Sequence, residues 1–307
     1  MNHSSAALGT SSGTGKRIKG VVAAITTPVT AALAPDEGKF VTLAKYLLDN
    51  GCDGLNVLGT TGEATSFTAE QRMGVMSAAA KALPLDRMMV GTGAAAVGDA
   101  VNLSRHAANL GFSGVLVLPP FYYKGVSDAG VIAYIGAIAE ATADSKNAGG
   151  GIPIYLYNFP ALSGVPYTPK LVSALVSQFG ARIAGLKDSS GDLPYAKEVA
   201  AISPALDVFP SNEATLMEAR NGGPFAGCIS ATANLNSKDC AKAYHDGDAA
   251  ALARAASIRK LFDGLPLIPG IKVLAAHIHN DPALERLMPP MSAFPDPAAL
   301  KARFDAI

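Results

Sequence analysis

From residue 20 onward the chain alternates between short apolar segments and segments with helical periodicity, and this alternation limits the fold more than any other feature. The apolar segments fall at residues 21–29, 55–58, 88–90, 115–118, 154–157, 183–186, 206–209 and 228–231. Short apolar runs bounded by turn residues are typical of strands buried on both faces. Strand-then-helix units of roughly 25–35 residues, repeated eight times, predict an α/β fold of the (β/α)8 TIM barrel type.

A doubly wound open sheet is the competing architecture for such an alternation. It would normally carry a glycine-rich dinucleotide fingerprint after its first strand, and the Val-Thr-Ala-Ala sequence at 29–32 is not one. We therefore predict a barrel over residues 18–245. We expect residues 1–17 to form a disordered tail and residues 246–307 to form extra C-terminal helices packed on the barrel.

Composition excludes several function classes. The formal net charge is zero, so no basic surface for nucleic acid is indicated. The sequence has neither an 18-residue apolar run nor the apolar core of a signal peptide, so we expect no membrane association and a cytoplasmic location. Cys52, Cys228 and Cys240 are widely spaced and typical of reduced structural thiols. His277 and His279 lack neighbouring ligands at metal-binding spacing, so no metal site is predicted.

The sixth strand ends in Lys187, which a polar turn follows. Burying an ammonium group is costly unless it is paired or loses its proton. A desolvated, neutral lysine is the nucleophile that forms Schiff bases with carbonyl substrates. A solvated lysine just past the end of a strand is the ordinary alternative, and Lys187 alone does not decide between them.

Other polar residues lie at or just beyond the predicted carboxyl ends of strands. In a barrel these ends form one face, where active sites are built. The set comprises Thr60, Thr61, Tyr122, Tyr157, Lys187, Asn212, Glu213 and Ser230. Tyr157 could transfer protons near an imine, and the Thr60–Thr61 turn could bind a small anion through hydroxyl and backbone N–H groups. Ordinary turn and strand roles would explain either feature alone. No cofactor motif is present, and a lysine imine needs none.

Three motifs together resemble those of a known family. They are Gly-Thr-Thr-Gly-Glu at 59–63, Tyr-Asn-Phe-Pro at 157–160 and Gly-Leu-Lys-Asp-Ser-Ser-Gly at 185–191. In order and spacing they are similar to the dihydrodipicolinate synthase / N-acetylneuraminate lyase family of pyruvate-dependent class I aldolases, over residues 18–276. The resemblance implies that Lys187 forms the Schiff base with pyruvate and that Tyr157 is the general acid/base. It implies no cofactor.

The same resemblance implies further roles. Thr60 and Thr61 would bind the pyruvate carboxylate or relay protons. Tyr122 would reach into a neighbouring subunit's site as a catalytic residue, and Ile229 and Ser230 would flank the pyruvate. The family is usually a homotetramer built as a dimer of dimers, so a homo-oligomer is expected.

The branch of the family depends on the second substrate. The synthases usually carry an arginine after the Tyr-Asn-x-Pro motif to bind the carboxylate of aspartate semialdehyde, and Leu162 stands there instead. The Pro-Ala-Leu-Ser-Gly sequence at 160–164 resembles the neuraminate lyase and keto-deoxy-sugar aldolase branch. The lyase's sugar-binding Asp-Glu pair is represented by Asn212 and Glu213. We expect Leu162, Asn212 and Glu213 to contact the second substrate.

These observations predict a lyase that joins or cleaves pyruvate and an aldehyde through an imine on Lys187. The preferred substrate is a 2-oxo-3-deoxy sugar acid or another 4-hydroxy-2-oxo acid. One alternative is the 4-hydroxy-tetrahydrodipicolinate (dihydrodipicolinate) synthase of lysine biosynthesis. Further alternatives are a keto-deoxy sugar acid dehydratase and a non-catalytic small-acid binding protein.

Overall fold

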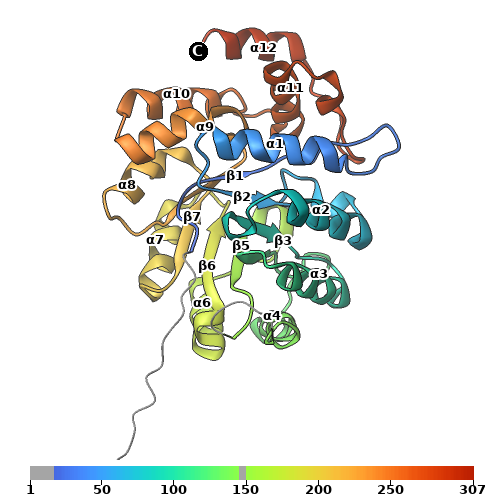
Figure 1. The fold of residues 1–307 in the computed structure, drawn as a ribbon. Helices are drawn as coiled ribbons and strands as arrows, with labels where there is room; N and C mark the ends of the chain where they lie inside the picture. Colours follow the sequence, from blue (N-terminus) through green and yellow to red (C-terminus); the bar gives the residue numbers. More distant parts are fainter. Residues whose placement is uncertain (1–16, 145–149) are drawn as a thin grey trace, which may run out of the picture.

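The computed structural model describes residues 17–144 and 150–307 and confirms the predicted barrel (Figure 1). All strands run parallel, in the order β7-β6-β5-β4-β3-β2-β1-β8. Between the two end strands of this order, Ala226 N donates to Val208 O at 2.9 Å, so the sheet is nearly closed. The predicted tail lies outside the described residues except for Arg17, whose guanidinium donates to Ala184 O at 3.1 Å.

The elements alternate as expected. The strands are β1 (Gly20–Ala24), β2 (Gly54–Val57), β3 (Met88–Gly91), β4 (Gly114–Val117), β5 (Ile154–Asn158), β6 (Ile183–Asp188), β7 (Asp207–Pro210) and β8 (Gly227–Ser230). The helices are α1 (Glu37–Asp49), α2 (Ala69–Ala82), α3 (Val97–Leu110), α4 (Asp128–Ala141), α5 (Pro160–Ser163), α6 (Pro169–Phe179), α7 (Leu193–Ile202), α8 (Leu216–Arg220), α9 (Ala233–Ala241), α10 (Ala249–Lys260), α11 (Leu267–His279) and α12 (Pro297–Asp305).

Local sequence explains several boundaries. Thr68, the N-cap of α2, accepts a hydrogen bond from Gln71 N and donates its own N–H to Gln71 Oε1, which forms a capping box. The first strand is shorter than the predicted 21–29. It ends at Ala24 because Thr26 N donates to the Asn234 side chain at 3.1 Å instead of to a neighbouring strand.

The apolar residues of the barrel form two layers. Alternate strand residues fill the barrel interior, and the others pack between the sheet and the surrounding helices. The interior cluster includes Val22, Met89, Leu116, Tyr155, Tyr157, Phe209 and Ile229. Burial on both faces accounts for strands that are almost continuously apolar, as the sequence analysis assumed.

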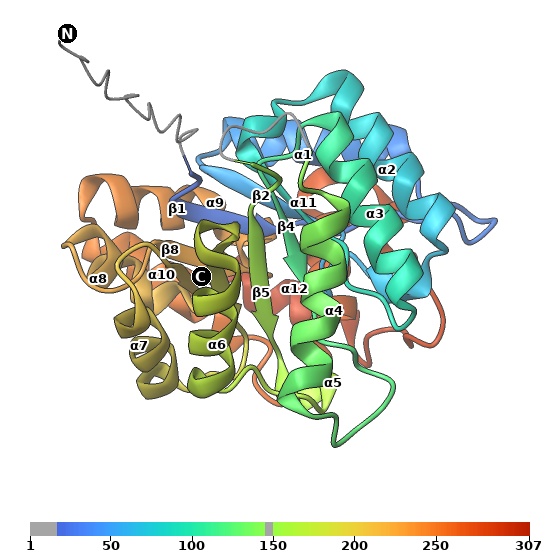
Figure 2. The ribbon, with the colours of Figure 1, turned by 90° about the horizontal axis from the view of Figure 1, so that it is seen from below.

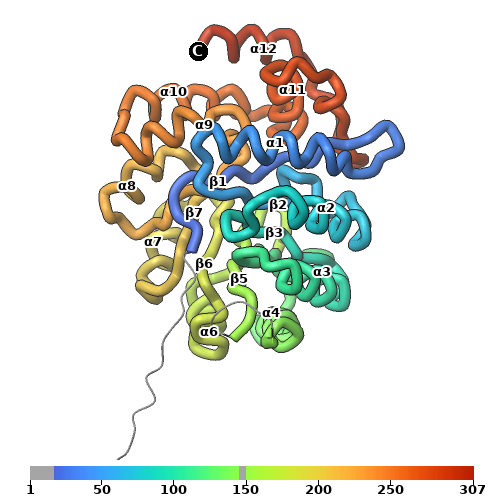
Figure 3. The backbone as a smooth tube through the Cα atoms, in the orientation of Figure 1, coloured from blue at the N-terminus to red at the C-terminus, as the bar shows by residue number. Residues whose placement is uncertain are grey.

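The C-terminal helices pack on the outside of the barrel. α11 contacts α9 and α12, and Figure 3 shows that the last two helices lie outside the ring formed by the earlier ones. In Figure 2 the strands are seen from the side, with α5 lying beyond the arrowhead of β5. Among the described residues, no helix has both the length and the apolar character to cross a bilayer.

Candidate active site

Lys187 and Tyr157 lie side by side at the carboxyl ends of two paired strands. They are register partners on β6 and β5, and the Lys187 Nζ lies 4.4 Å from the centroid of the Tyr157 ring. Both residues are 3% exposed. Within the described part of the chain, no carboxylate forms an ion pair with this ammonium. A buried lysine that lies against an aromatic face and has no anionic partner is well placed to act as a nucleophile on a carbonyl substrate.

The strand that carries Lys187 is fixed on both sides. A Cβ on Gly185 would lie 2.0 Å from Asp207 O, so only glycine permits β6 to approach β7 this closely. On the other side, the residues next to the Tyr157–Lys187 pair are also paired. Asn158 Nδ2 donates to Asp188 Oδ1 at 2.8 Å, and Ser189 N donates to Asn158 O at 2.8 Å. These contacts hold Tyr157 and Lys187 in register.

The turn after β2 supplies a third group to this site. The Thr60 hydroxyl and the Tyr157 hydroxyl are 3.1 Å apart and share a hydrogen bond. The turn begins at Leu58 and ends at Glu63, and both residues have a left-handed backbone with φ of 53°. Thr61, within this turn, is 6% exposed. The phenol of Tyr157 is therefore connected to a hydroxyl on one side and lies against the lysine on the other.

A buried ion pair anchors this turn to the C-terminal part of the chain. Glu63 pairs with Lys272 on α11, and their side chains are 0% and 1% exposed. Lys272 also donates to Arg286 O at 2.8 Å, and Met288 N donates to Glu63 Oε2 at 2.7 Å. Burial lowers the pKa of Lys272, and the charge of Glu63 opposes this effect. The sequence analysis did not anticipate this pair.

A cavity of about 650 Å³ opens above these groups. Its lining comprises Thr60, Thr61, Tyr157, Phe159, Leu162, Lys187, Ser189, Ser211, Ile229, Ala231, Arg259, Pro266, Leu267, Ile268, Pro269, Pro290, Met291, Ser292, Ala293 and Pro295. This volume lies within the range of about 300–1,000 Å³ that is usual for small-molecule sites. The structure thus brings six residues selected from the sequence to one cavity: Thr60, Thr61, Tyr157, Leu162, Lys187 and Ile229.

Three other residues selected from the sequence do not line the cavity. Ser230 and Glu213 are fully buried, and the Ser230 hydroxyl donates to Glu213 Oε1 at 2.5 Å. Glu213 also accepts from Thr232 and, at 3.2 Å, from Arg259. The Asn212 side chain accepts from Ala214 N at 3.0 Å, which caps the short helix that follows. In this structure the three residues bond to other protein groups instead of lining the cavity.

Tyr122 also lies away from the cavity. It is 73% exposed, and its ring packs edge-on against Tyr123 with 5.2 Å between centroids. Lys124 donates to Phe121 O and, at 2.7 Å, to Ser163 O, so the Tyr122 loop is held beside the short helix α5, which carries Leu162. The role of Tyr122 in a neighbouring subunit stays a prediction.

Arg259 is a cavity residue that the sequence analysis missed. It lies on α10, its side chain is 33% exposed, and one of its nitrogens bonds to Glu213. Residues 266–295 supply much of the remaining wall. No local motif marks these positions, because they reach the cavity only through the packing of helices that follow the eighth strand.

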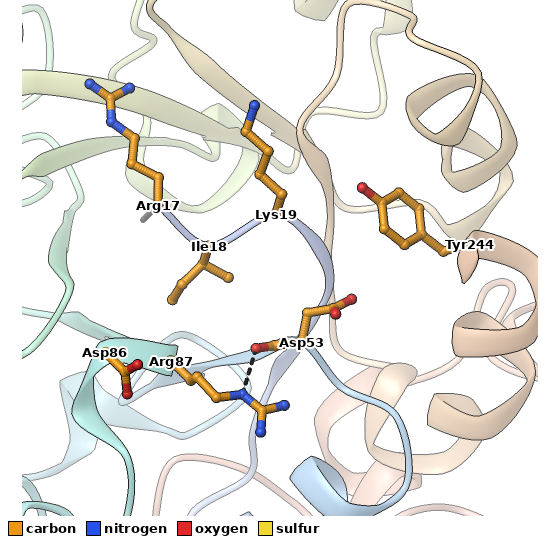
Figure 4. A pocket seen from close by; sticks show the side chains of 7 residues that line it. All are labelled: Arg17, Ile18, Lys19, Asp53, Asp86, Arg87 and Tyr244. Atoms are coloured by element: carbon orange, nitrogen blue, oxygen red, sulfur yellow. Dashed lines mark hydrogen bonds between the residues drawn. The ribbon is translucent and has the colours of Figure 1, made fainter. Parts of the chain in front are cut away.

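A second cavity, of about 660 Å³, lies at the amino ends of the strands (Figure 4). It is lined by Arg17, Ile18, Lys19, Asp53, Asp86, Arg87 and Tyr244. Its basic groups already have protein partners: Arg87 donates to Asp53 O at 2.9 Å and Arg17 to Ala205 O at 2.6 Å. Because barrel active sites form at the carboxyl ends of strands, the cavity above Lys187 is the candidate active site.

The donor set of the site suits imine chemistry. It contains an amine, a phenol and a hydroxyl in contact, with a turn that could bind a carboxylate. In the described part of the chain, no three His, Cys, Asp or Glu residues group together to hold a metal ion.

Burial raises the pKa of the Cys52 thiol to about 12 and that of Cys228 well above its ordinary value, so these thiols are poor nucleophiles.

Comparison with known proteins agrees with this geometry. The model of the dihydrodipicolinate synthetase family matches residues 17–278. The chain belongs to that family. An uncharacterized DapA-like lyase from Chloroflexus aurantiacus is 32% identical over 298 residues, which cover 94% of this chain and 97% of the relative. As a member of the family, the chain is a pyruvate aldolase or lyase.

Two solved structures of the family have nearly the same fold. Dihydrodipicolinate synthase from Agrobacterium tumefaciens superimposes with a TM-score of 0.84 at 28% identity, covering 94% of this chain and 98% of that one. YagE from Escherichia coli K12, solved in complex with pyruvate, superimposes with a TM-score of 0.81 at 27% identity and the same coverage. YagE is named a putative 2-dehydro-3-deoxy-D-gluconate aldolase. The two neighbours thus carry different enzyme names, a synthase and a putative aldolase.

Proposed function

We propose that the enzyme joins or cleaves pyruvate and an aldehyde through a Schiff base on Lys187, with a 4-hydroxy-2-oxo acid as the condensed species. The observation that carries the proposal is the contact of three groups at the cavity floor. The Lys187 Nζ lies 4.4 Å from the Tyr157 ring, and the Tyr157 hydroxyl bonds to Thr60 at 3.1 Å. An amine of this kind attacks a ketone carbon, and the neighbouring phenol supplies and removes protons.

The reaction follows from these positions. The amine nitrogen of Lys187 adds to the ketone carbon of pyruvate to form a carbinolamine, which takes up a proton and loses water to leave a protonated imine. A proton then leaves the pyruvate methyl group through Tyr157, and the electron pair gives an enamine. The enamine carbon attacks the aldehyde carbon, and the resulting alkoxide takes up a proton. Water hydrolyses the imine and releases the 4-hydroxy-2-oxo acid, and cleavage is the reverse.

The pyruvate carboxylate is assigned to the turn after β2. Thr60 and Thr61 line the cavity, and successive backbone N–H groups in a turn favour a small anion. Ile229, which is fully buried, supplies an apolar side to the same floor. The polar turn and the apolar strand would together orient pyruvate with its ketone toward Lys187.

Borohydride trapping tests the proposal. Reduction in the presence of pyruvate should attach a stable pyruvate-derived group to the peptide that contains Lys187, as seen by peptide mass spectrometry. The Lys187→Ala variant should show no adduct, and a variant of an exposed lysine, Lys170→Ala, should be labelled normally. If the folded enzyme shows no adduct with pyruvate in large excess, the imine mechanism is wrong.

The synthase reaction with aspartate semialdehyde is the second candidate. The 28% identical Agrobacterium neighbour, a dihydrodipicolinate synthase, favours it. The presence of Leu162 argues against the synthase reaction, because a leucine at the cavity cannot form the paired hydrogen bonds that an arginine makes to a carboxylate. Steady-state kinetics with aspartate semialdehyde, compared with an uncharged aldehyde of similar length, would separate the two candidates.

We also propose a homo-oligomer, built as a dimer of dimers. Two large aromatic side chains, Tyr122 and Tyr123, are 73% and 72% exposed on one loop, which is unusual for a surface without a partner. Sedimentation of the wild type and of a Tyr122→Ser/Tyr123→Ser variant would test whether this loop lies between subunits. A cytoplasmic location stays part of the proposal and is testable by fractionation.

A further inference from the structure

We propose that the second substrate is an aldehyde with an apolar, ring-sized group, which packs against an apolar rim around the mouth of the cavity. This inference rests on the proposed imine function. We define the apolar rim as Leu162, Leu267 and Met291, with the prolines beside them. The condensation would form a bond between the methyl carbon of pyruvate and the aldehyde carbon, so the apolar group would be attached to C4 of the 4-hydroxy-2-oxo acid.

Burial separates the floor of the cavity from its mouth. Tyr157, Lys187 and Ile229 are 3%, 3% and 0% exposed, whereas Leu162, Leu267 and Met291 are 61%, 37% and 39% exposed. The pyruvate-binding groups therefore lie deep, and the rim contacts whatever is attached to the aldehyde carbon on the open side. The rim is formed by segments far apart in sequence: Leu162 lies on α5, Leu267 is the first residue of α11, and Met291 lies between α11 and α12.

Single exposed leucines are ordinary on protein surfaces, but a group of them around one cavity is not. Three of the nine large hydrophobic side chains that are exposed in the described residues line this cavity. The wall between them adds Phe159, Pro266 and Pro295. Contiguous apolar surface of this kind favours an apolar ligand, because each part of it gains from being removed from water.

Polar side chains are a minority of the cavity wall. Above the floor they are Ser189, Ser211, Ser292 and Arg259. One nitrogen of Arg259 is already bonded to the fully buried Glu213, at 3.2 Å. A polyhydroxy aldehyde needs a partner for each hydroxyl group that leaves water, and the side chains of the prolines and leucines of the wall offer none. An aromatic or alicyclic ring needs no such partners and buries a large area.

The test measures aldehyde selectivity at saturating pyruvate. We would determine kcat/KM for benzaldehyde and for glyceraldehyde in the wild type and in Leu162→Ser. The intrinsic reactivity of each aldehyde is the same with both enzymes. It therefore cancels when the benzaldehyde-to-glyceraldehyde ratio of kcat/KM in the variant is compared with that in the wild type. Loss of one apolar contact should lower the benzaldehyde-to-glyceraldehyde ratio by about tenfold or more. The control Val97→Ser removes an exposed apolar side chain outside the cavity and should leave the ratio unchanged.

A second variant should reverse the preference, from an apolar aldehyde to one that carries a carboxylate. Leu162→Arg should lower kcat/KM for benzaldehyde and raise it for succinic semialdehyde, because arginine forms paired hydrogen bonds with a carboxylate. If the wild type prefers glyceraldehyde and Leu162→Ser leaves the ratio unchanged, the apolar-aldehyde assignment is wrong. A change in sedimentation with Leu162→Ser, without a change in the ratio, would also overturn it and indicate that the rim is a subunit contact.

Failure of this inference is distinguishable from failure of the proposed function. Trapping of pyruvate on Lys187 by borohydride needs no aldehyde and does not depend on the rim. If trapping succeeds and the aldehyde ratio does not respond to Leu162, the imine mechanism stands and the apolar aldehyde is rejected. If trapping fails, the mechanism itself is wrong.

Discussion

Replacing Lys272 with methionine should strongly lower the free energy of unfolding, although Lys272 is not one of the reacting groups. The substitution keeps the apolar stem of the side chain and removes the ammonium that pairs with Glu63. Both side chains are essentially inaccessible, at 1% and 0% exposure. The carboxylate of Glu63 would keep its bond from Met288 N at 2.7 Å but would lose its counter-charge, and Arg286 O would lose a donor at 2.8 Å.

The size of the effect follows from the burial of the pair. Leaving one partner of a buried ion pair unmatched typically costs about 3–5 kcal/mol. That is a large share of the roughly 5–15 kcal/mol by which folded domains are stable. The free energy of unfolding, measured by urea denaturation followed by circular dichroism at pH 7.5, should fall by that amount in Lys272→Met. The control is Lys301→Met, which breaks the partly exposed pair with Glu285 at 2.9 Å and should cost under about 1 kcal/mol.

A double variant separates the buried charge from other effects of the substitution. Glu63→Gln/Lys272→Met removes both charges and should be more stable than Lys272→Met alone, since no unpaired charge stays buried. The reasoning is refuted if Lys272→Met costs no more than Lys301→Met. It is also refuted if the double variant is less stable than Lys272→Met, because then the penalty does not come from the charge of Glu63.

Two further predictions concern the phenol and the buried thiols. Tyr157→Phe removes the hydroxyl that bonds to Thr60 and should lower kcat by about 10²–10⁴-fold, while pyruvate is still trapped on the lysine. Burial raises the pKa of Cys52 from 9.0 to about 12, so the unfolded chain releases this proton first. The contribution of the protonated Cys52 thiol to the free energy of unfolding is fully present below pH 9. It is lost as the pH rises toward 12, by up to about 1.4 kcal/mol per pH unit. Urea midpoints at pH 8 and 10.5 should therefore differ less in Cys52→Ala than in the wild type.

The barrel and the centre of its site could be predicted from sequence because both are encoded locally. Each strand is a short apolar run that ends in polar residues, and in a barrel these ends meet at one face. Lys187 and Tyr157 end neighbouring strands, so their contact follows once the fold is known. Thr60 lies in the turn after β2, and its bond to Tyr157 shows that this turn reaches the same floor.

Position at a strand end does not determine where a side chain points. Glu213 follows β7 and was expected to contact substrate, yet it turns inward and accepts from Ser230, Thr232 and Arg259. The hydroxyl of Ser230 is a member of the same hydrogen-bond network and donates to Glu213. The partner that draws Glu213 inward, Arg259, lies on a helix after the eighth strand, and no periodicity or motif in the sequence connects the two.

The helix α11 joins the two halves of the site. Its first residue, Leu267, lies on the apolar rim, and Lys272, further along the same helix, holds the turn that carries Thr60 and Thr61 through Glu63. The helix therefore connects the apolar rim to the turn that follows β2. A change at Leu267, which leaves the ion pair intact, should alter aldehyde selectivity without altering pyruvate trapping. Lys272→Met should alter both, because it releases the turn and the wall together.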